Sequence, residues 1–253
     1  MTKARTNASA SPAVGRNMII NGAMNVAQRG TSSTGIGASS GYFTCDRWKI
    51  TTGNTAGRLT MTQDSSAPSG FANSIKLDCT TADTSIAADE ITILGQSLEG
   101  QNVQAFAKGT SDAKPFVVSF YVKGNASATY VAELFDHDNT RNITQAFSVT
   151  TDWARVELTF PADTTGALDD DNASSLELWI WLHAGSTYKG GTLPLTWAGY
   201  SNANAAEGAD SFFDSTSRTF FITGLQLEVG QNPTSFESEP VERTLAKCQR
   251  YYL

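Results

Sequence analysis

The chain has 253 residues, of which 17% are charged, and its formal net charge is −7. This charge and the absence of any run of Lys and Arg argue against nucleic acid as the main partner, because neutralising phosphates needs clustered cations. A single domain of this length buries roughly three quarters of its unfolded surface, so it needs no disulfide or metal to fold. Three cysteines, an odd number, are expected as free thiols: Cys45, Cys79 and Cys248.

Residues 1–15 are small, polar and irregular, with Pro12 and Gly15 among them. Such a segment cannot bury enough apolar surface to order itself, so we expect an extended N-terminal attachment arm over residues 1–16. No apolar run follows Met1, so we expect no signal peptide and synthesis in a cytoplasm. No stretch approaches the ~20 apolar residues of a membrane span, and no membrane insertion is expected.

Most of the remaining chain predicts β-structure. Residues 17–30 predict a first strand and turn, and the Gly-, Ser- and Thr-rich run 31–41 predicts a surface loop. Runs with alternating or continuous apolar residues predict further strands; they are 58–63, 74–79, 116–123, 130–135, 143–149, 155–160, 176–182 and 219–229. The run 116–123 is almost wholly apolar, so it is expected in the interior of a sheet with both faces buried.

Two short helices are predicted among the strands. Residues 98–107 place Val103, Phe106 and Ala107 on one side. Near the end, Ser238 is expected to cap a helix, with Pro240 in its first turn. Its apolar residues follow helical spacing and predict a stripe that faces the domain or a partner chain: Val241, Leu245, Cys248 and Tyr252.

Eight to ten strands without an alternating strand–helix rhythm favour an all-β fold. We predict a jelly-roll-type antiparallel β-sandwich with an N-terminal extended arm, one short internal helix and a short C-terminal helix. The domain boundaries are 1–16 for the arm and 17–253 for the sandwich.

Catalytic chemistry has little support in the sequence. His137 falls in a predicted hairpin tip and His183 ends a strand, and neither has the context of a nucleophilic site. The acidic run 169–172 is either a solvated loop or a calcium site, although it lacks the spacing of a calcium-binding loop. We therefore expect no catalytic residues, no metal and no cofactor.

One strand carries a pattern that suggests binding. In the run 177–183, Glu177, Trp179, Trp181 and His183 share one face, with the two indoles about 7 Å apart. This face is either a sugar-stacking platform or it packs beneath another segment or subunit. Trp197 and Tyr200 form a second aromatic candidate, within the long low-charge segment 185–210. A loop of that length is commonly functional or mobile.

Six motifs, three in each half of the chain, resemble a known family. Those of the N-terminal half are Arg16–Met24, Gln28–Thr31 and Asp46–Trp48, and those of the C-terminal half are Ile222–Gly230, Pro233–Glu237 and Cys248–Tyr252. Together they resemble the jelly-roll-like domain of bacteriophage tail-fibre and virion-surface proteins. The resemblance implies a virion component made in the host cytoplasm, with other virion structural proteins as partners and a homotrimeric assembly.

The function expected from the resemblance is structural: a tail fibre, capsid decoration or head fibre that docks on the particle and serves host adsorption or particle stabilisation. Side chains near the two chain ends are expected at the attachment or oligomer interface; they are Lys3, Arg5, Tyr251, Tyr252 and Leu253. The alternative is a carbohydrate-binding module for host surface glycans. A glycan-cleaving enzyme would need two carboxylates roughly 5–10 Å apart across a cleft, which the sequence cannot place.

Overall fold

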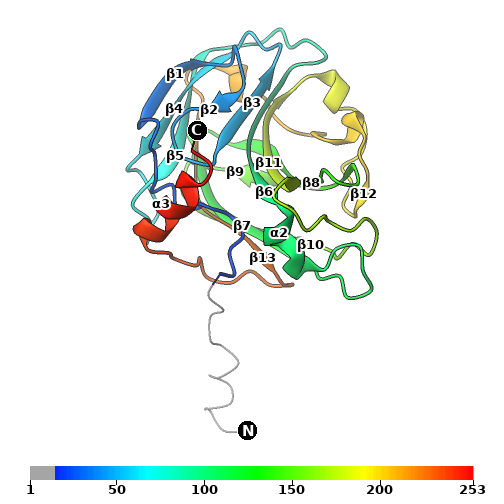
Figure 1. The fold of residues 1–253 in the computed structure, drawn as a ribbon. Coiled ribbons are helices and arrows are strands. Elements are labelled where there is room, and N and C mark those ends of the chain that lie inside the picture. The colour runs from blue at the N-terminus through cyan, green and yellow to red at the C-terminus, as the bar shows by residue number, and fades with distance from the viewer. Residues whose placement is uncertain (1–14, 253) are drawn as a thin grey trace.

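A computed structural model describes residues 15–252 of the chain. Residues 1–14 of the predicted arm over 1–16 lie outside the described residues, as do the predicted interface residues Lys3, Arg5 and Leu253. Two antiparallel sheets pack face to face (Figure 1). The predicted jelly-roll-type β-sandwich is therefore confirmed.

The first sheet has six strands in the order β1-β4-β5-β13-β7-β10. Their bounds are β1 Ser32–Ile36, β4 Arg58–Asp64, β5 Ser74–Thr81, β13 Thr219–Val229, β7 Phe116–Gly124 and β10 Ala154–Phe160. As predicted, β7 is an interior strand with both faces largely buried.

The second sheet has seven strands in the order β12-β9-β8-β11-β6-β3-β2. Their bounds are β12 Ala198–Gly199, β9 Arg141–Val149, β8 Ala128–Asp136, β11 Ser174–Ala184, β6 Ile91–Glu99, β3 Lys49–Gly53 and β2 Gly41–Tyr42. Strand β11 pairs with β8 on one side and β6 on the other, so it lies in the middle of this sheet.

Helical segments are few and short. They are α2 Gly100–Val103, η1 Gln104–Phe106, η2 Ser186–Tyr188, η3 Asn202–Asn204, η4 Phe212–Asp214 and α3 Val241–Gln249. Among the described residues, no helix is long and apolar enough to cross a membrane.

The core fills the space between the two sheets. Alternating burial is clearest in β4, where Leu59 and Met61 are fully buried and their neighbours are partly exposed. Facing them from the other sheet are the even-numbered residues of β11, Leu178 and Ile180 among them. These are the aliphatic positions that the sequence assigns to the core.

Two predictions for the N-terminal region are wrong. Residues 17–30 form no strand, because their backbone bonds to isolated partners rather than to a ladder: Met18 N–H donates to Leu227 O, and Ile20 bonds through both backbone groups to the Gln96 side chain. The segment 31–41 includes strand β1, which pairs with β4.

The two predicted helices exist but differ in detail. The internal helix is only α2 and η1, because residues 98 and 99 extend strand β6. Helix α3 begins at Val241 after Pro240, without a side-chain cap, so Ser238 is not its N-cap. Its buried residues are Thr244 and Cys248. At the ends of the predicted stripe, Val241 and Tyr252 are 50% and 42% exposed, so these residues are not buried against the domain, and a partner chain stays the predicted alternative for them.

Candidate functional site

The outer face of the seven-stranded sheet carries a row of side chains that runs across four strands. Trp179 on β11 pairs with Glu133 on β8 and with Gly95 on β6, and Gly95 pairs with Lys49 on β3. A Cβ atom at Gly95 would lie 2.8 Å from Trp179 Cδ1. Only glycine at this position therefore allows the indole of Trp179 to lie over β6.

An aromatic patch surrounds this indole, formed by Phe135, His137, Trp179 and Tyr200. The rings of Phe135 and Trp179 stack with centroids 4.8 Å apart and planes 8° apart. Tyr200 and His137 meet Phe135 edge-on, at 5.2 and 4.9 Å. All four side chains are at least partly exposed to solvent.

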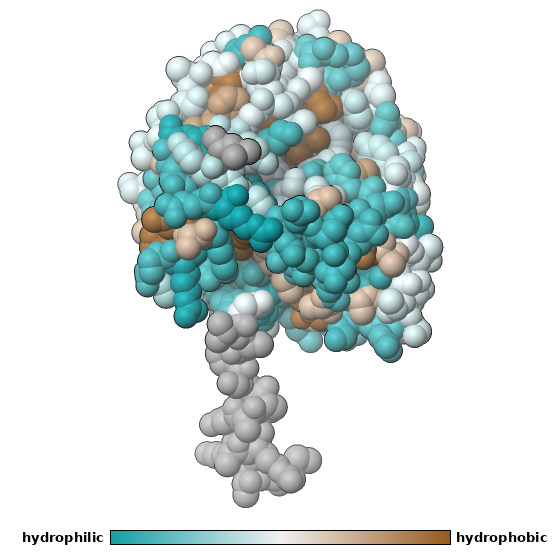
Figure 2. Space-filling view, in the orientation of Figure 1, coloured by the Kyte–Doolittle hydropathy of each residue, from teal (hydrophilic) through white to brown (hydrophobic). Residues whose placement is uncertain are grey.

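A carboxylate lies beside the aromatic patch. Glu177 on β11 accepts a hydrogen bond from Ser97 Oγ, and His137 Nε2 lies 3.3 Å from Glu177 Oε1. Both groups are reachable from solvent, with side-chain exposures of 15% for Glu177 and 44% for His137. Apolar surface next to a few polar groups is the usual composition of a ligand site. Figure 2 shows apolar surface in a hollow above the centre of the view, where Figure 1 draws this sheet.

Trp181 does not share this exposure, although it is on the same face of β11. Its side chain is 1% exposed and lies in a second apolar cluster under the segment 185–210. Tyr188 packs against its ring at 5.4 Å, and the cluster is completed by small residues, Ala205, Ala206 and Ala209. The sequence left two alternatives for this face, and burial under another segment holds for Trp181.

Glu133 is fully buried beneath the same segment. It accepts hydrogen bonds from Trp181 Nε1 at 2.5 Å and from Asn142 Nδ2 at 2.8 Å. Burial raises the pKa of this carboxyl to about 7, although the two hydrogen bonds oppose the rise. Because no part of the side chain reaches solvent, Glu133 cannot touch a sugar bound on the surface.

His183 also leaves the predicted platform. It is 0% exposed, with Nε2 2.9 Å from Glu90 Oε2 and Nδ1 2.8 Å from Ser211 Oγ. The prediction that Trp181 and His183 present their rings to a ligand is therefore corrected. The physical reason is that residues 185–214 fold back over this end of β11.

The two residues of the second aromatic candidate, Trp197 and Tyr200, also lie in different surroundings. Trp197 donates its indole N–H to Pro161 O at 2.9 Å and packs 5.6 Å from Phe116 at the edge of the core. Tyr200, three residues later, joins the aromatic patch. The structure thus brings together Glu177, Trp179 and Tyr200, and it adds Phe135 and His137, which the sequence analysis placed in a strand and a hairpin tip.

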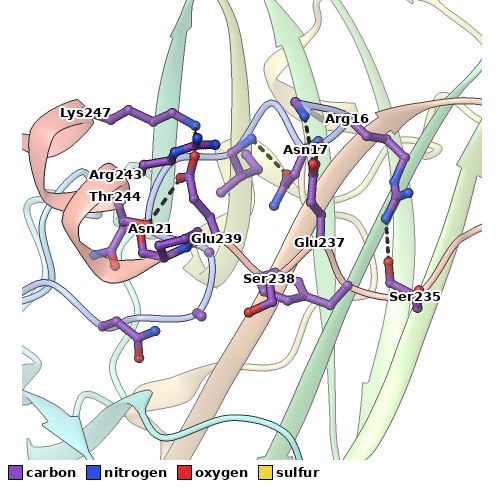
Figure 3. A pocket seen from close by; sticks show the side chains of 17 residues that line it. Arg16, Asn17, Asn21, Ser235, Glu237, Ser238, Glu239, Arg243, Thr244 and Lys247 are labelled. Carbon is purple, nitrogen blue, oxygen red and sulfur yellow. Dashed lines mark hydrogen bonds and ion pairs between the residues drawn. The ribbon is translucent and has the colours of Figure 1, made fainter. Parts of the chain in front are cut away.

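A polar pocket of about 570 Å³ lies at the other end of the domain, between the first described residues and helix α3 (Figure 3). Glu237 accepts hydrogen bonds from the backbone of Gly15 and Asn17, both at 2.7 Å. Lys247 pairs with Glu239 at 2.7 Å. These groups are engaged with one another, so they join the two ends of the domain.

The motifs that carry the family resemblance meet at this junction. Trp48 donates its indole N–H to Asn21 O at 3.2 Å, and Asn21 Nδ2 donates to Asp46 O at 3.0 Å. Asn17 Oδ1 accepts from Leu227 N at 3.1 Å. The shared residue types therefore serve the closure of the fold, and they do not form the aromatic patch.

The C-terminal tyrosines lie on arginines. The guanidinium of Arg47 is 3.6 Å from the ring centroid of Tyr251, and that of Arg29 is 4.5 Å from Tyr252. Of the predicted interface residues within the described range, Tyr251 is partly buried and Tyr252 is exposed. Whether they contact a partner stays a prediction.

The acidic run 169–172 has the character of a surface loop. Asp169, Asp170, Asp171 and Asn172 are all exposed. Asp171 Oδ1 accepts a hydrogen bond from Ala173 N two residues later, as in a local turn. The solvated loop is the alternative that this geometry fits.

Comparison with known proteins gives neighbours only at the level of fold. No protein-family model matches the chain, and no curated protein matches it. Solved structures with a similar β-sandwich include one described as "CBM4 structure and function", at 12% identity and a TM-score of 0.41, over 83% of this chain and 98% of that one. A second is TmCBM61 in complex with β-1,4-galactotriose, at 10% identity and a TM-score of 0.45, over 85% and 99%.

A phage protein is also among these structures. It is the enzymatically active domain of tailspike protein 4 from bacteriophage CBA120, at 12% identity and a TM-score of 0.40. The similarity spans 85% of this chain and 22% of that structure. The neighbours are thus carbohydrate-binding modules and a tailspike domain, and at these scores they assign neither a family nor a ligand to this chain.

Proposed function

We propose that this protein is a non-enzymatic carbohydrate-binding β-sandwich that recognises a surface glycan through the aromatic patch. The observation that carries the proposal is the partly exposed stack of Phe135 and Trp179 beside Glu177 and His137. Aromatic rings offer flat apolar area to the C–H face of a sugar, while a carboxylate and an imidazole can bond its hydroxyl groups.

The residues of the site have separable roles in this proposal. Trp179 and Tyr200 supply the stacking surface. Phe135 stacks against the indole of Trp179 and fixes its orientation. Glu177 accepts hydrogen bonds from sugar hydroxyl groups. Lys49, which lies beyond Gly95 on the same row as Trp179, donates hydrogen bonds to the sugar. Glu133 and Trp181 lie below and fix the sheet and its covering segment.

The test compares two tryptophans that are exposed on opposite faces. We expect Trp179→Ala to lower the affinity for a bound glycan at least about tenfold, measured by affinity electrophoresis against a panel of bacterial O-polysaccharides and soluble β-glucans and β-galactans. Trp153→Ala is the matched control, because Trp153 is partly exposed on the six-stranded sheet beside Phe221. Equal retention of both variants and the wild type on every glycan would contradict the proposal.

We further propose that the setting is a phage virion, as a tail-fibre, head-fibre or capsid-decoration subunit. The support is the sequence resemblance. In addition, the motifs that carry it lie together where the first described residue, Gly15, bonds to Glu237. A trimer is the expected assembly. Light scattering on the full chain and on a chain lacking residues 1–14 tests it, since this deletion retains Gly15 and Arg16 with their bonds to residues 235–237.

Each outcome of the mass measurement has a definite meaning. A trimer in both forms places assembly in the sandwich, and a trimer lost on deletion places it in the first 14 residues. A monomer in both forms contradicts the trimer and favours a subunit that assembles only on its particle. The glycan proposal stands or falls separately, on the Trp179 comparison.

A further inference from the structure

Three side chains that can bind a metal converge at the end of β11 that is far from the aromatic patch. Asp83 follows β5, Glu90 precedes β6, and His183 lies near the end of β11. One potential donor atom from each lies within 4.8 Å of the others, and all three side chains are buried. None of them has a role in the proposed sugar site.

The charges of this cluster are not balanced by protein groups. Among residues 15–252, the one ion pair formed by either carboxylate is that of Glu90 with His183. Two buried acids therefore share one imidazole. Buried charge of this kind is stabilised by a bound cation.

Each of the three groups is held from outside the cluster. Asp83 Oδ2 accepts from Ala56 N at 2.8 Å and from Thr55 Oγ1 at 3.0 Å. Glu90 Oε1 accepts from Ala87 N at 2.8 Å. These bonds fix one oxygen of each carboxylate, and the second oxygen of Glu90, Oε2, faces His183 Nε2.

The imidazole is held in the same manner. Ser211 Oγ lies 2.8 Å from His183 Nδ1 and also accepts from Phe213 N at 3.1 Å. This arrangement directs Nε2 toward Glu90 Oε2. A ligating histidine whose other nitrogen is bonded to the surrounding protein is characteristic of metal sites.

We propose that Asp83, Glu90 and His183 form a binding site for a divalent transition metal of the Zn²⁺ type. One imidazole nitrogen and two carboxylate oxygens are ligands that Zn²⁺ accepts, with water available for a fourth position. Donor atoms around a tetrahedral Zn²⁺ are roughly 3.4 Å apart, which fits within the observed 4.8 Å limit. Binding would tie the segments 83–90 and 211–213 to β11.

The test uses the full, untagged chain after treatment with a chelator. Co²⁺ is the probe, because a tetrahedral Co²⁺ site gives visible absorption bands, and Zn²⁺ should then displace it. We expect one equivalent to bind, with a rise in melting temperature. If neither metal binds at near one equivalent to the wild type, the cluster is only a hydrogen-bonded network and the proposal is wrong.

Two variants connect the signal to the site. His183→Gln should weaken Co²⁺ binding at least about tenfold, whereas His137→Gln should leave it unchanged. His137 is the other of the two histidines in the chain, and it is exposed. Glu90→Gln serves as the second site variant if His183→Gln fails to fold. Retention of Co²⁺ binding in a folded His183→Gln or Glu90→Gln variant would overturn the assignment, and so would loss of Co²⁺ binding in His137→Gln.

Discussion

The indole N–H of Trp181 donates a 2.5 Å hydrogen bond to Glu133, from Nε1 to Oε2, and both side chains are buried under the segment 185–210. A carboxylate in this position is desolvated without a cationic partner of its own, and its pKa rises as a result. The pair therefore couples the stability of the segment 185–210, which covers it, to pH.

The first prediction concerns stability against pH. The carboxyl pKa of Glu133 is raised from 4.5 to about 7 in the folded protein. Between these values the unfolded chain releases its proton while the folded chain keeps it, so the contribution of Glu133 to stability is present below pH 4.5 and is lost as the pH rises to 7. The full difference corresponds to about 3 kcal/mol. Urea denaturation at pH 4.5 and pH 7.5 measures it.

Glu133→Gln should remove this part of the pH dependence. Asn142 Oδ1 has no hydrogen-bond partner within residues 15–252, so it can turn to accept from the new amide. Glu157→Gln, at an exposed carboxylate on the other sheet, is the control and should retain the slope. If wild type and Glu133→Gln have the same pH profile, Glu133 is not the group responsible.

The second prediction separates the two tryptophans of β11 by stability. Trp181→Ala should cost about 3–5 kcal/mol, because it opens a cavity under residues 185–210 and removes a donor from Glu133. Trp179→Ala, at a partly exposed ring, should cost about 1 kcal/mol. Chemical denaturation of both variants is the measurement. Equal costs would show that the indoles are equally buried in solution.

The third prediction concerns a buried cation. Lys108 Nζ pairs with Asp136 and lies 3.2 Å from Asp163 Oδ2, and the side chains of Lys108 and Asp136 are fully buried. Lys108→Met should destabilise the fold by about 3–5 kcal/mol, because it leaves Asp136 without its compensating charge. Lys76→Ala is the control, since its pair with Asp78 is partly exposed and should be worth less than about 1 kcal/mol. A small effect at Lys108 would mean that water reaches Asp136.

The fourth prediction concerns the thiols. Burial raises the pKa of Cys45 and of Cys248 to about 12 and that of Cys79 to about 11. Because the thiolate is the reactive form, the folded chain should not react with Ellman's reagent at pH 8 within an hour. Three equivalents should react at once in denaturant. A fast-reacting thiol in the folded chain would show that one of these sites opens locally.

Sequence periodicity determined most of the sandwich. Strands such as β4 and β5 alternate apolar and polar residues, and this pattern depends only on which face each residue occupies. The same logic placed Leu178 and Ile180 in the core. Strand β6 escaped prediction, because the buried polar residues Thr92 and Gln96 and the glycine Gly95 interrupt the continuous apolar run that marks a strand such as β7. Short edge strands such as β2 and β12 carry too few residues for any period.

The candidate site depended on the tertiary structure. Trp179 and Trp181 are equivalent in sequence, both aromatic and both on the outer face of β11, yet one is partly exposed and the other buried. The difference arises from where residues 185–210 cross the sheet, which no local pattern encodes. Phe135 joins Trp179 only through the register of β8 against β11. Likewise, Asp83, Glu90 and His183 meet because three distant segments end at the same edge of the fold, since proximity across a sandwich is set by strand order and not by spacing along the chain.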